Sequence, residues 1–308
     1  MSLKDFQQTT ALGPDALFLL EGATFDTSPG GHHRPKQIVI NALPLSKLPV
    51  AMRRMGWHTS AALMQRWFDS PAWQMPEEWK SEKGQPDPSN LTKAECDETL
   101  VKMSWAMRFR QCQEALKLAE ERLDTPNAIR RLNDQLRKAG WDGVGTFILG
   151  STELSARQMD ATSQINIANL GDNLDVLDDM YGALGKATMK VGVVGKTFRK
   201  RENLNGQTRT YFQIEYAGFY IRDHYDFNGP QFLGIWTDDR VLTKFEMIAN
   251  TTPHTPSIFN VHGAPIAKVT NDDFRAYRRK TGMGGDFIIY SDVLWKRVEK
   301  TIDLGPER

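Results

Sequence analysis

The sequence predicts an α+β protein, with a mainly helical N-terminal region and a C-terminal, mostly antiparallel β-sheet that carries a few short helices. Two observations predict this class. Before residue 140, apolar side chains recur three and four positions apart, which is the period of an α-helix. After Val144, short apolar runs alternate with turn residues, as in antiparallel strands. We therefore expect a helical region over residues 1–140 and an α+β domain over residues 141–308.

A long helical hairpin is expected in the N-terminal region. Thr92 and Glu95 form the capping-box pattern T-x-x-E, which predicts a helix from Thr92 to about Leu123. Thr125 and Pro126 predict the start of a second helix, because threonine caps a helix and proline fits its first turn. The connection between them is so short that the two helices are expected to be antiparallel.

The other elements follow from local patterns. The residues from 80 to 91 are rich in Gly, Pro, Ser and Asn and predict an exposed loop. Asn205-Gly206 lies between two apolar runs and predicts a hairpin of long strands at 189–198 and 209–221. Further elements are expected as helices at 46–55, 60–68, 172–181, 241–249 and 271–280, and as strands at 146–149, 232–236, 257–261 and 286–298.

Composition excludes several classes of protein. The chain has 39 basic and 38 acidic residues, so its balance of charge gives no field that would attract nucleic acid. It lacks an apolar run long enough to span a membrane, and its first residues do not resemble a signal peptide. We expect synthesis in the cytoplasm and secretion, if any, without a signal peptide. Cys96 and Cys112 would lie roughly 24 Å apart on one helix, too far for a disulfide.

The strongest candidate site is the run from Asp223 to Asp226, which holds two carboxylates, the imidazole of His224 and the phenol of Tyr225. It follows an apolar strand and precedes a Gly-Pro turn, so the side chains are expected at the rim of the sheet. Neighbouring carboxylates raise one another's pKa, which suits general acid–base catalysis or a divalent cation as cofactor. The alternative is a strand end whose acidic side chains only cap the next turn.

A second polar group is expected to bind substrate. Arg275 and Arg279 lie four positions apart on a predicted helix, where they present one face to a phosphate. The alternative is a solvated helix surface on which these arginines pair with neighbouring aspartates. His262 and Asp286 are the other candidates, the histidine as a catalytic group and the aspartate as a substrate ligand or the end of a turn.

Three segments carry a resemblance to a known family. Met52–Trp57, Tyr216–Asp223 and Thr281–Phe287 resemble a proteobacterial domain-of-unknown-function family whose genes lie beside type VI secretion genes. That resemblance implies a secretion-linked context but no activity. The pattern Asp223-x-Tyr225-Asp226 is similar to the D-x-Y-D signature of colicin M-type bacteriocins, which cleave a pyrophosphate-linked lipid. The His-Arg pair that follows in those proteins is replaced here by Phe232 and Leu233.

These observations predict a type VI secretion-associated antibacterial effector, with a hydrolase acting on a phosphate ester or pyrophosphate of the cell envelope as the favoured activity. Its expected partners are a secretion spike or adaptor protein and a cognate immunity protein. Catalysis would depend on Asp223, Tyr225, Asp226 and His262. The rival interpretation is a non-enzymatic adaptor or structural module of the secretion system.

Overall fold

The computed structural model describes residues 43–81, 83–171, 176–201, 207–243 and 266–306. The contacts between residues divide the chain into two units. The first comprises Met1–Gln74 and Phe227–Gly285, and the second comprises Met75–Asp226 and Asp286–Arg308. Helices and strands are mixed in the sequence, so the fold is α+β, with a curled and mostly antiparallel sheet in the second unit.

The first unit combines helices with a two-stranded antiparallel sheet. Trp67 is fully buried and packs edge-on against Phe227 and Phe274, and these two rings stack on each other. Gly284 allows this packing, since a Cβ atom there would lie 2.4 Å from the Trp67 ring. The elements of this unit are η2 (Leu45–Lys47), α1 (Leu48–Arg54), α2 (His58–Asp69), β6 (Phe232–Thr237), β7 (Ile266–Thr270) and α9 (Asn271–Thr281).

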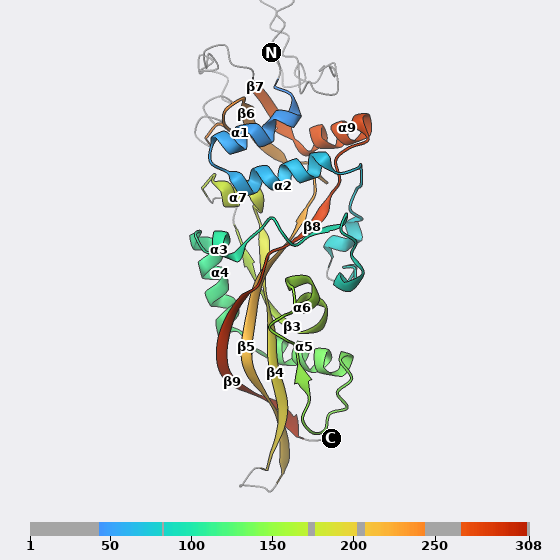
Figure 1. Cartoon of the computed structure of the whole chain (residues 1–308), viewed down its shortest axis with the longest axis vertical. Coiled ribbons are helices and arrows are strands. Elements are labelled where there is room, and N and C mark those ends of the chain that lie inside the picture. The colour runs from blue at the N-terminus through green and yellow to red at the C-terminus, as the bar shows by residue number, and fades with distance from the viewer. Residues whose placement is uncertain (1–42, 82, 172–175, 202–206, 244–265, 307–308) are drawn as a thin grey trace, which may run out of the picture. The chain divides into compact units, whose positions relative to one another are not determined.

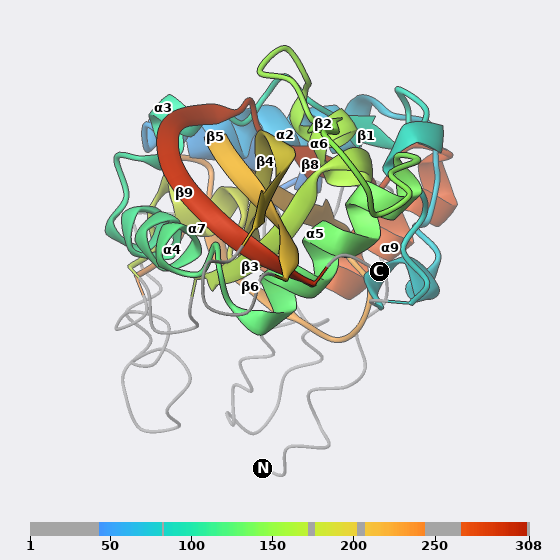
Figure 2. The ribbon, with the colours of Figure 1, turned by 90° about the horizontal axis from the view of Figure 1, so that it is seen from below.

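The second unit is built on a sheet whose central strands are β4 and β5 (Figure 1). Among the residues described, its strand order is β1-β8-β5-β4-β2, with β3 also pairing with β4 and β9 with β5. Of the strand pairs in the described part of this sheet, β1 with β8 is the parallel one. Figure 2 shows β9 curving across β5. The strands are β1 (Cys96–Asp97), β2 (Ile148–Leu149), β3 (Gln164–Leu170), β4 (Ala187–Arg201), β5 (Thr208–Tyr225), β8 (Phe287–Tyr290) and β9 (Leu294–Pro306).

Short helices pack around this sheet. The helices α4, α5 and α6 contact β3, and α4 and α6 also contact β4. No helix in the ranges given above has both the length and the apolar character that crossing a bilayer requires. The helical elements of this unit are η3 (Glu77–Lys80), η4 (Pro88–Asn90), α3 (Met103–Ala106), α4 (Arg110–Glu121), α5 (Pro126–Lys138), α6 (Ala156–Thr162) and α7 (Asp179–Ala183).

The predicted pair of long strands is confirmed. The strands β4 and β5 run antiparallel from Thr188↔Arg222 to Arg201↔Thr208. The predicted strand at 232–236 corresponds to β6, and the predicted helix at 271–280 corresponds to α9, which Gly282 ends with a φ of 70°. The Asn205-Gly206 turn, the strand at 257–261 and most of the helix at 241–249 lie outside the described residues.

Other elements differ from the prediction. Thr92 does donate hydrogen bonds to the Glu95 carboxylate, but no helix continues from there. Asp97 instead accepts the amide hydrogens of Thr99 and Leu100, which turns the chain after β1, and the helices that follow are α3, from Met103, and α4, from Arg110. Cys96 therefore lies in a strand, and both cysteines are buried thiols that are not joined in a disulfide. The expected last strand is two strands, β8 and β9. The elements α6 and β3 occupy residues for which the sequence predicted no helix or strand.

Candidate functional site

The predicted acidic run lies at the C-terminal end of β5. The strand continues through Tyr225, four residues beyond its expected end, because Asp223 and Tyr225 pair with Ile289 and Phe287 of β8. Side chains alternate between the two faces of a strand. Asp223 and Tyr225 therefore share one face, whereas His224 shares the other with Arg222.

Asp223 is a partly exposed residue whose carboxyl group is held among protein atoms. Its Oδ1 accepts the backbone N–H of His224 at 2.8 Å. Burial raises the pKa of this carboxyl well above its ordinary value, and the charge of nearby Asp226 raises it further. A carboxyl in this environment retains a proton at a pH where ordinary aspartates have lost theirs.

Tyr225 and Asp226 differ in how accessible they are. Tyr225 is 7% exposed and stacks on Phe287, and burial raises the pKa of its phenol. The Asp226 carboxylate lies 2.8 Å from Nζ of Lys80, which also pairs with Glu77. The Asp226 and Lys80 side chains are 12% and 25% exposed, so this ion pair reaches solvent.

His224 has the most unusual surroundings in the run. Burial, together with the positive charges of Arg222, Lys80 and Lys190, lowers the pKa of its imidazole to about 4. The ring hydrogen-bonds with the backbone of Trp79, while Nε2 is buried and has no hydrogen-bond partner. The Trp79 bond is therefore made by the other nitrogen, and the neutral ring leaves Nε2 as an unused acceptor.

The other predicted site residues make contacts of their own. Asp286 is 1% exposed and accepts the backbone N–H of Met75 at 3.0 Å. In the first unit, Arg275 donates to the carbonyl oxygens of Phe227 and Gly229 and pairs with Asp272, so it holds a turn in place. Arg279 is exposed on α9.

His262 lies outside the described residues. Within the described ranges, no group of three or more histidine, cysteine or acidic side chains is arranged to hold a metal ion.

A buried polar cluster adjoins His224 and was not predicted. Its centre is Asp160, whose side chain is 3% exposed. Oδ1 of Asp160 accepts hydrogen bonds from Lys190 Nζ at 2.7 Å and from the Tyr220 hydroxyl at 2.8 Å. Oδ2 accepts the Tyr290 hydroxyl at 3.0 Å and lies 3.5 Å from Nε of Arg222. One carboxylate thus holds four donors from β4, β5 and β8.

Two glycines let Asp160 reach the sheet. Gly192 of β4 and Gly218 of β5 are register partners and lie beneath Met159, the neighbour of Asp160 on α6. A Cβ atom would lie 2.3 Å from Cγ of Met159 at Gly192, and 2.8 Å from its Cε at Gly218. Because such contacts are too short for real atoms, α6 can approach this closely only over glycine.

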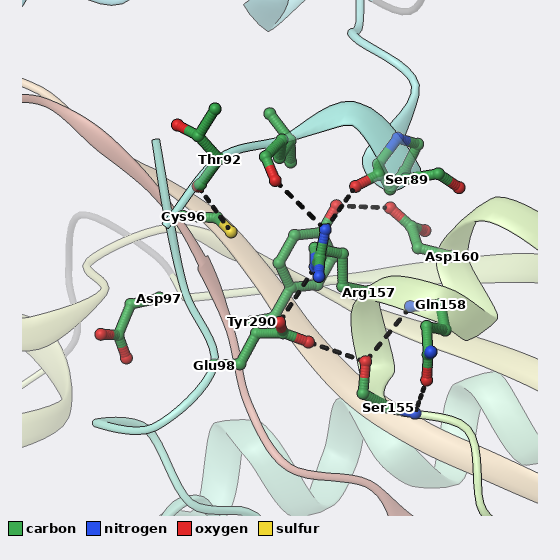
Figure 3. A network of polar contacts seen from close by, with 12 residues as sticks. Ser89, Thr92, Cys96, Asp97, Glu98, Ser155, Arg157, Gln158, Asp160 and Tyr290 are labelled. Atoms are coloured by element: carbon green, nitrogen blue, oxygen red, sulfur yellow. Dashed lines mark hydrogen bonds and ion pairs between the residues drawn. The ribbon is translucent and has the colours of Figure 1, made fainter. Parts of the chain in front are cut away.

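A second network fixes the chain that leads into β1 (Figure 3). Arg157 of α6 pairs with Glu98 at 2.9 Å and donates to the carbonyl oxygens of Pro88 and Leu91. Ser155 donates to the other Glu98 oxygen at 2.7 Å. The segment that was expected to be an exposed loop is therefore tied to the helix that carries Asp160.

The family of this chain is shown by a match over residues 43–305 to the model of a family of unknown function, DUF6402. The chain belongs to this family. No curated protein and no solved structure matches it. The family assignment covers both units and gives no activity, so the function has to be argued from the side chains.

Proposed function

We propose that the protein is a type VI secretion-associated antibacterial effector that hydrolyses a phosphate ester or pyrophosphate bond in the bacterial cell envelope. In this proposal the catalytic group is His224 at the end of β5, and Asp223, on the opposite face of the strand, and Asp226, beyond its end, support it. The chain would be made in the cytoplasm and exported without a signal peptide. It would act with a spike or adaptor protein and be neutralised by an immunity protein.

The observation that carries the proposal is the state of His224. Its Nε2 atom is buried and without a partner, and its ring stays neutral near pH 7 because its pKa is about 4. A neutral imidazole can accept a proton from an attacking water molecule, and a bound anionic substrate would strengthen it as a base by raising its pKa. The positive charges of Lys80, Lys190 and Arg222 around it favour the approach of an anionic substrate.

The two carboxylates have separate roles in this proposal. Asp223 lies on the face of β5 opposite His224, so its role is to hold the strand end, where its Oδ1 accepts the His224 backbone N–H. Asp226 is already paired with Lys80, so it positions that ammonium group at the solvent-accessible end of the site. Tyr225 contributes packing against Phe287. The resemblance to D-x-Y-D proteins and to a family near type VI secretion genes supports the envelope as target.

Expression in the bacterial periplasm, behind an added export signal, tests the proposal. We expect growth arrest with the natural chain, and its loss with His224→Gln and with the double variant Asp223→Ala, Asp226→Ala. Glu299→Gln, at an exposed residue paired with Arg297, is the matched control and should remain toxic. Unchanged toxicity of both site variants at equal protein levels would rule out this mechanism.

The same experiment distinguishes the rival class. An adaptor would cause no growth arrest in the cytoplasm or periplasm and would co-purify with a secretion spike protein. That pair of results would favour the adaptor interpretation over the enzyme.

A further inference from the structure

The cluster around Asp160 contains more hydrogen-bond donors than acceptors. Oδ1 of Asp160 accepts two hydrogen bonds, and Oδ2 accepts one from Tyr290 and lies 3.5 Å from Nε of Arg222. Nε of Arg222 donates to the Tyr290 hydroxyl at 3.2 Å. Lys190 donates one of its three N–H bonds to Asp160, and Nε2 of His224 is a buried atom without a hydrogen-bond partner.

The cluster also contains more positive than negative charge. Lys190 and Arg222 are 9% and 5% exposed, and Asp160 is the carboxylate that lies within ion-pair distance of both. Arg131 of α5 adds a further positive charge near Lys190. An uncompensated buried cation is costly, because burial removes it from water without supplying a counter-charge. This imbalance is relieved when an additional anion binds.

The cluster lies next to the unused acceptor of His224. Tyr220, Arg222 and His224 occupy alternate positions of β5 and so share one face. Lys190 is opposite Tyr220 on β4, and Tyr290 is opposite Arg222 on β8. The partly exposed pair of Lys80 and Asp226 marks the end of this row that reaches solvent.

We propose that Lys190 and Arg222 bind a phosphoryl group, with Asp160, Tyr220 and Tyr290 holding the two cations in place and His224 directly beside the bound group. Arginine presents two parallel donors to a phosphate, and lysine supplies a point charge. Nε2 of His224 accepts a hydrogen bond from a monoprotonated phosphate oxygen. The assignment of this site to a substrate rests on the proposed function, whereas the binding of phosphate does not.

Calorimetry on the full-length protein tests the assignment, with inorganic phosphate and pyrophosphate titrated separately in chloride buffer at pH 7. We expect both to bind, and Arg222→Gln and Lys190→Met each to weaken binding at least about tenfold, which corresponds to about 1.4 kcal/mol. Lys196→Met, at an exposed lysine of the same strand, is the control and should bind normally. Absence of binding to the natural protein, or normal binding by a folded Arg222→Gln variant, would overturn the assignment.

If the cluster variants do not fold, nuclear magnetic resonance of the His224 ring in the natural protein provides a second test. In the natural protein, phosphate is expected to shift the Nε2 resonance and to raise the pKa of His224 above about 4, because an adjacent anion favours the imidazolium. An unchanged titration of His224 at saturating phosphate contradicts the assignment. Binding without periplasmic toxicity refutes the proposed function alone, and His224-dependent toxicity without binding refutes only this site.

Discussion

Nζ of Lys190 lies 2.7 Å from Oδ1 of Asp160, and these two side chains are 11% and 3% exposed. The pair joins helix α6 to strand β4 across the interior of the second unit. Because Asp160 also accepts two tyrosine hydroxyls, its charge balances part of the positive charge of the cluster and orders its donors at the same time. The first two predictions concern this arrangement.

Asp160→Asn removes the negative charge and leaves Lys190 and Arg222 buried without a counter-charge. We expect this variant to lower the free energy of unfolding by about 3–5 kcal/mol, as when one partner of a buried ion pair is removed. Urea denaturation measures the change. Glu299→Gln, in an exposed ion pair, should stay within about 0.5 kcal/mol of the natural protein, and an equal effect of the two substitutions would contradict this role of Asp160.

Gly192→Ala places a methyl group against Met159 and pushes α6 away from the sheet. We expect a loss of about 1–3 kcal/mol in the free energy of unfolding, typical of overpacking. The double variant with Met159→Ala supplies the control, since shortening that side chain makes room for the added methyl group. A cost of Gly192→Ala that is the same in both backgrounds would show that the contact with Met159 does not limit this position.

Arg157→Ala removes the ion pair with Glu98 and the hydrogen bonds to the carbonyl oxygens of Pro88 and Leu91. We expect trypsin to cut at exposed Lys93 several-fold faster in the native protein, because the segment before β1 opens more often. Mass spectrometry of timed digests measures this rate. Arg110→Ala, which removes an exposed pair with Glu114, should leave the rate unchanged.

His224 makes stability depend on pH in acid. Its pKa in the folded protein is about 4, below the ordinary value of 6.5, so between these values the unfolded chain binds more protons. Stability is therefore lost as the pH falls from 6.5 to 4, by at most about 1.4 kcal/mol for each pH unit. His224→Gln should show a weaker dependence over this window in urea denaturation, and an identical dependence would contradict the environment described for the ring.

The Asp223 carboxyl makes stability depend on pH in the opposite direction to His224. The pKa of its carboxyl is raised on folding, so above the ordinary aspartate value the folded protein binds more protons than the unfolded chain. Its contribution to stability is present at low pH and is lost as the pH rises towards neutrality. We expect Asp223→Asn, which stays neutral, to gain stability relative to the natural protein from pH 4 to pH 7. A constant difference over that range would contradict the raised pKa.

The parts of the fold that local patterns specify were predicted from the sequence. The strands β4 and β5 follow from apolar runs around one turn, and α9 ends where Gly282 adopts a left-handed conformation. The Thr92 and Glu95 pattern also formed its hydrogen bonds. That pattern, however, predicts only the contacts of those two residues. The next hydrogen bonds, from the amides of Thr99 and Leu100 to Asp97, turn the chain after β1.

The cluster around Asp160 was beyond such patterns. Its members are 30, 60 and 130 positions from Asp160, and no period or spacing connects them. Lys190 lies in β4, which is buried on both faces. This strand therefore lacks the alternation of apolar and polar residues from which an inward-facing lysine could be recognised in the sequence. Arg222 could have indicated the cluster, because it is a charged residue at an interior position directly before the acidic run. The predicted roles of Arg275, Arg279, Asp286 and His262 stay predictions.

The strand β8 is four residues long, and the alternation of its side chains decides which of them faces Arg222. Tyr290 faces Arg222, while Ile289 faces Asp223. One amino acid inserted before Phe287 would slide the strand by about 3.3 Å and exchange its two faces. A hydrocarbon side chain would then replace the phenol that touches both Asp160 and Arg222. Length changes at this point of the chain should thus be tolerated only in steps of two residues.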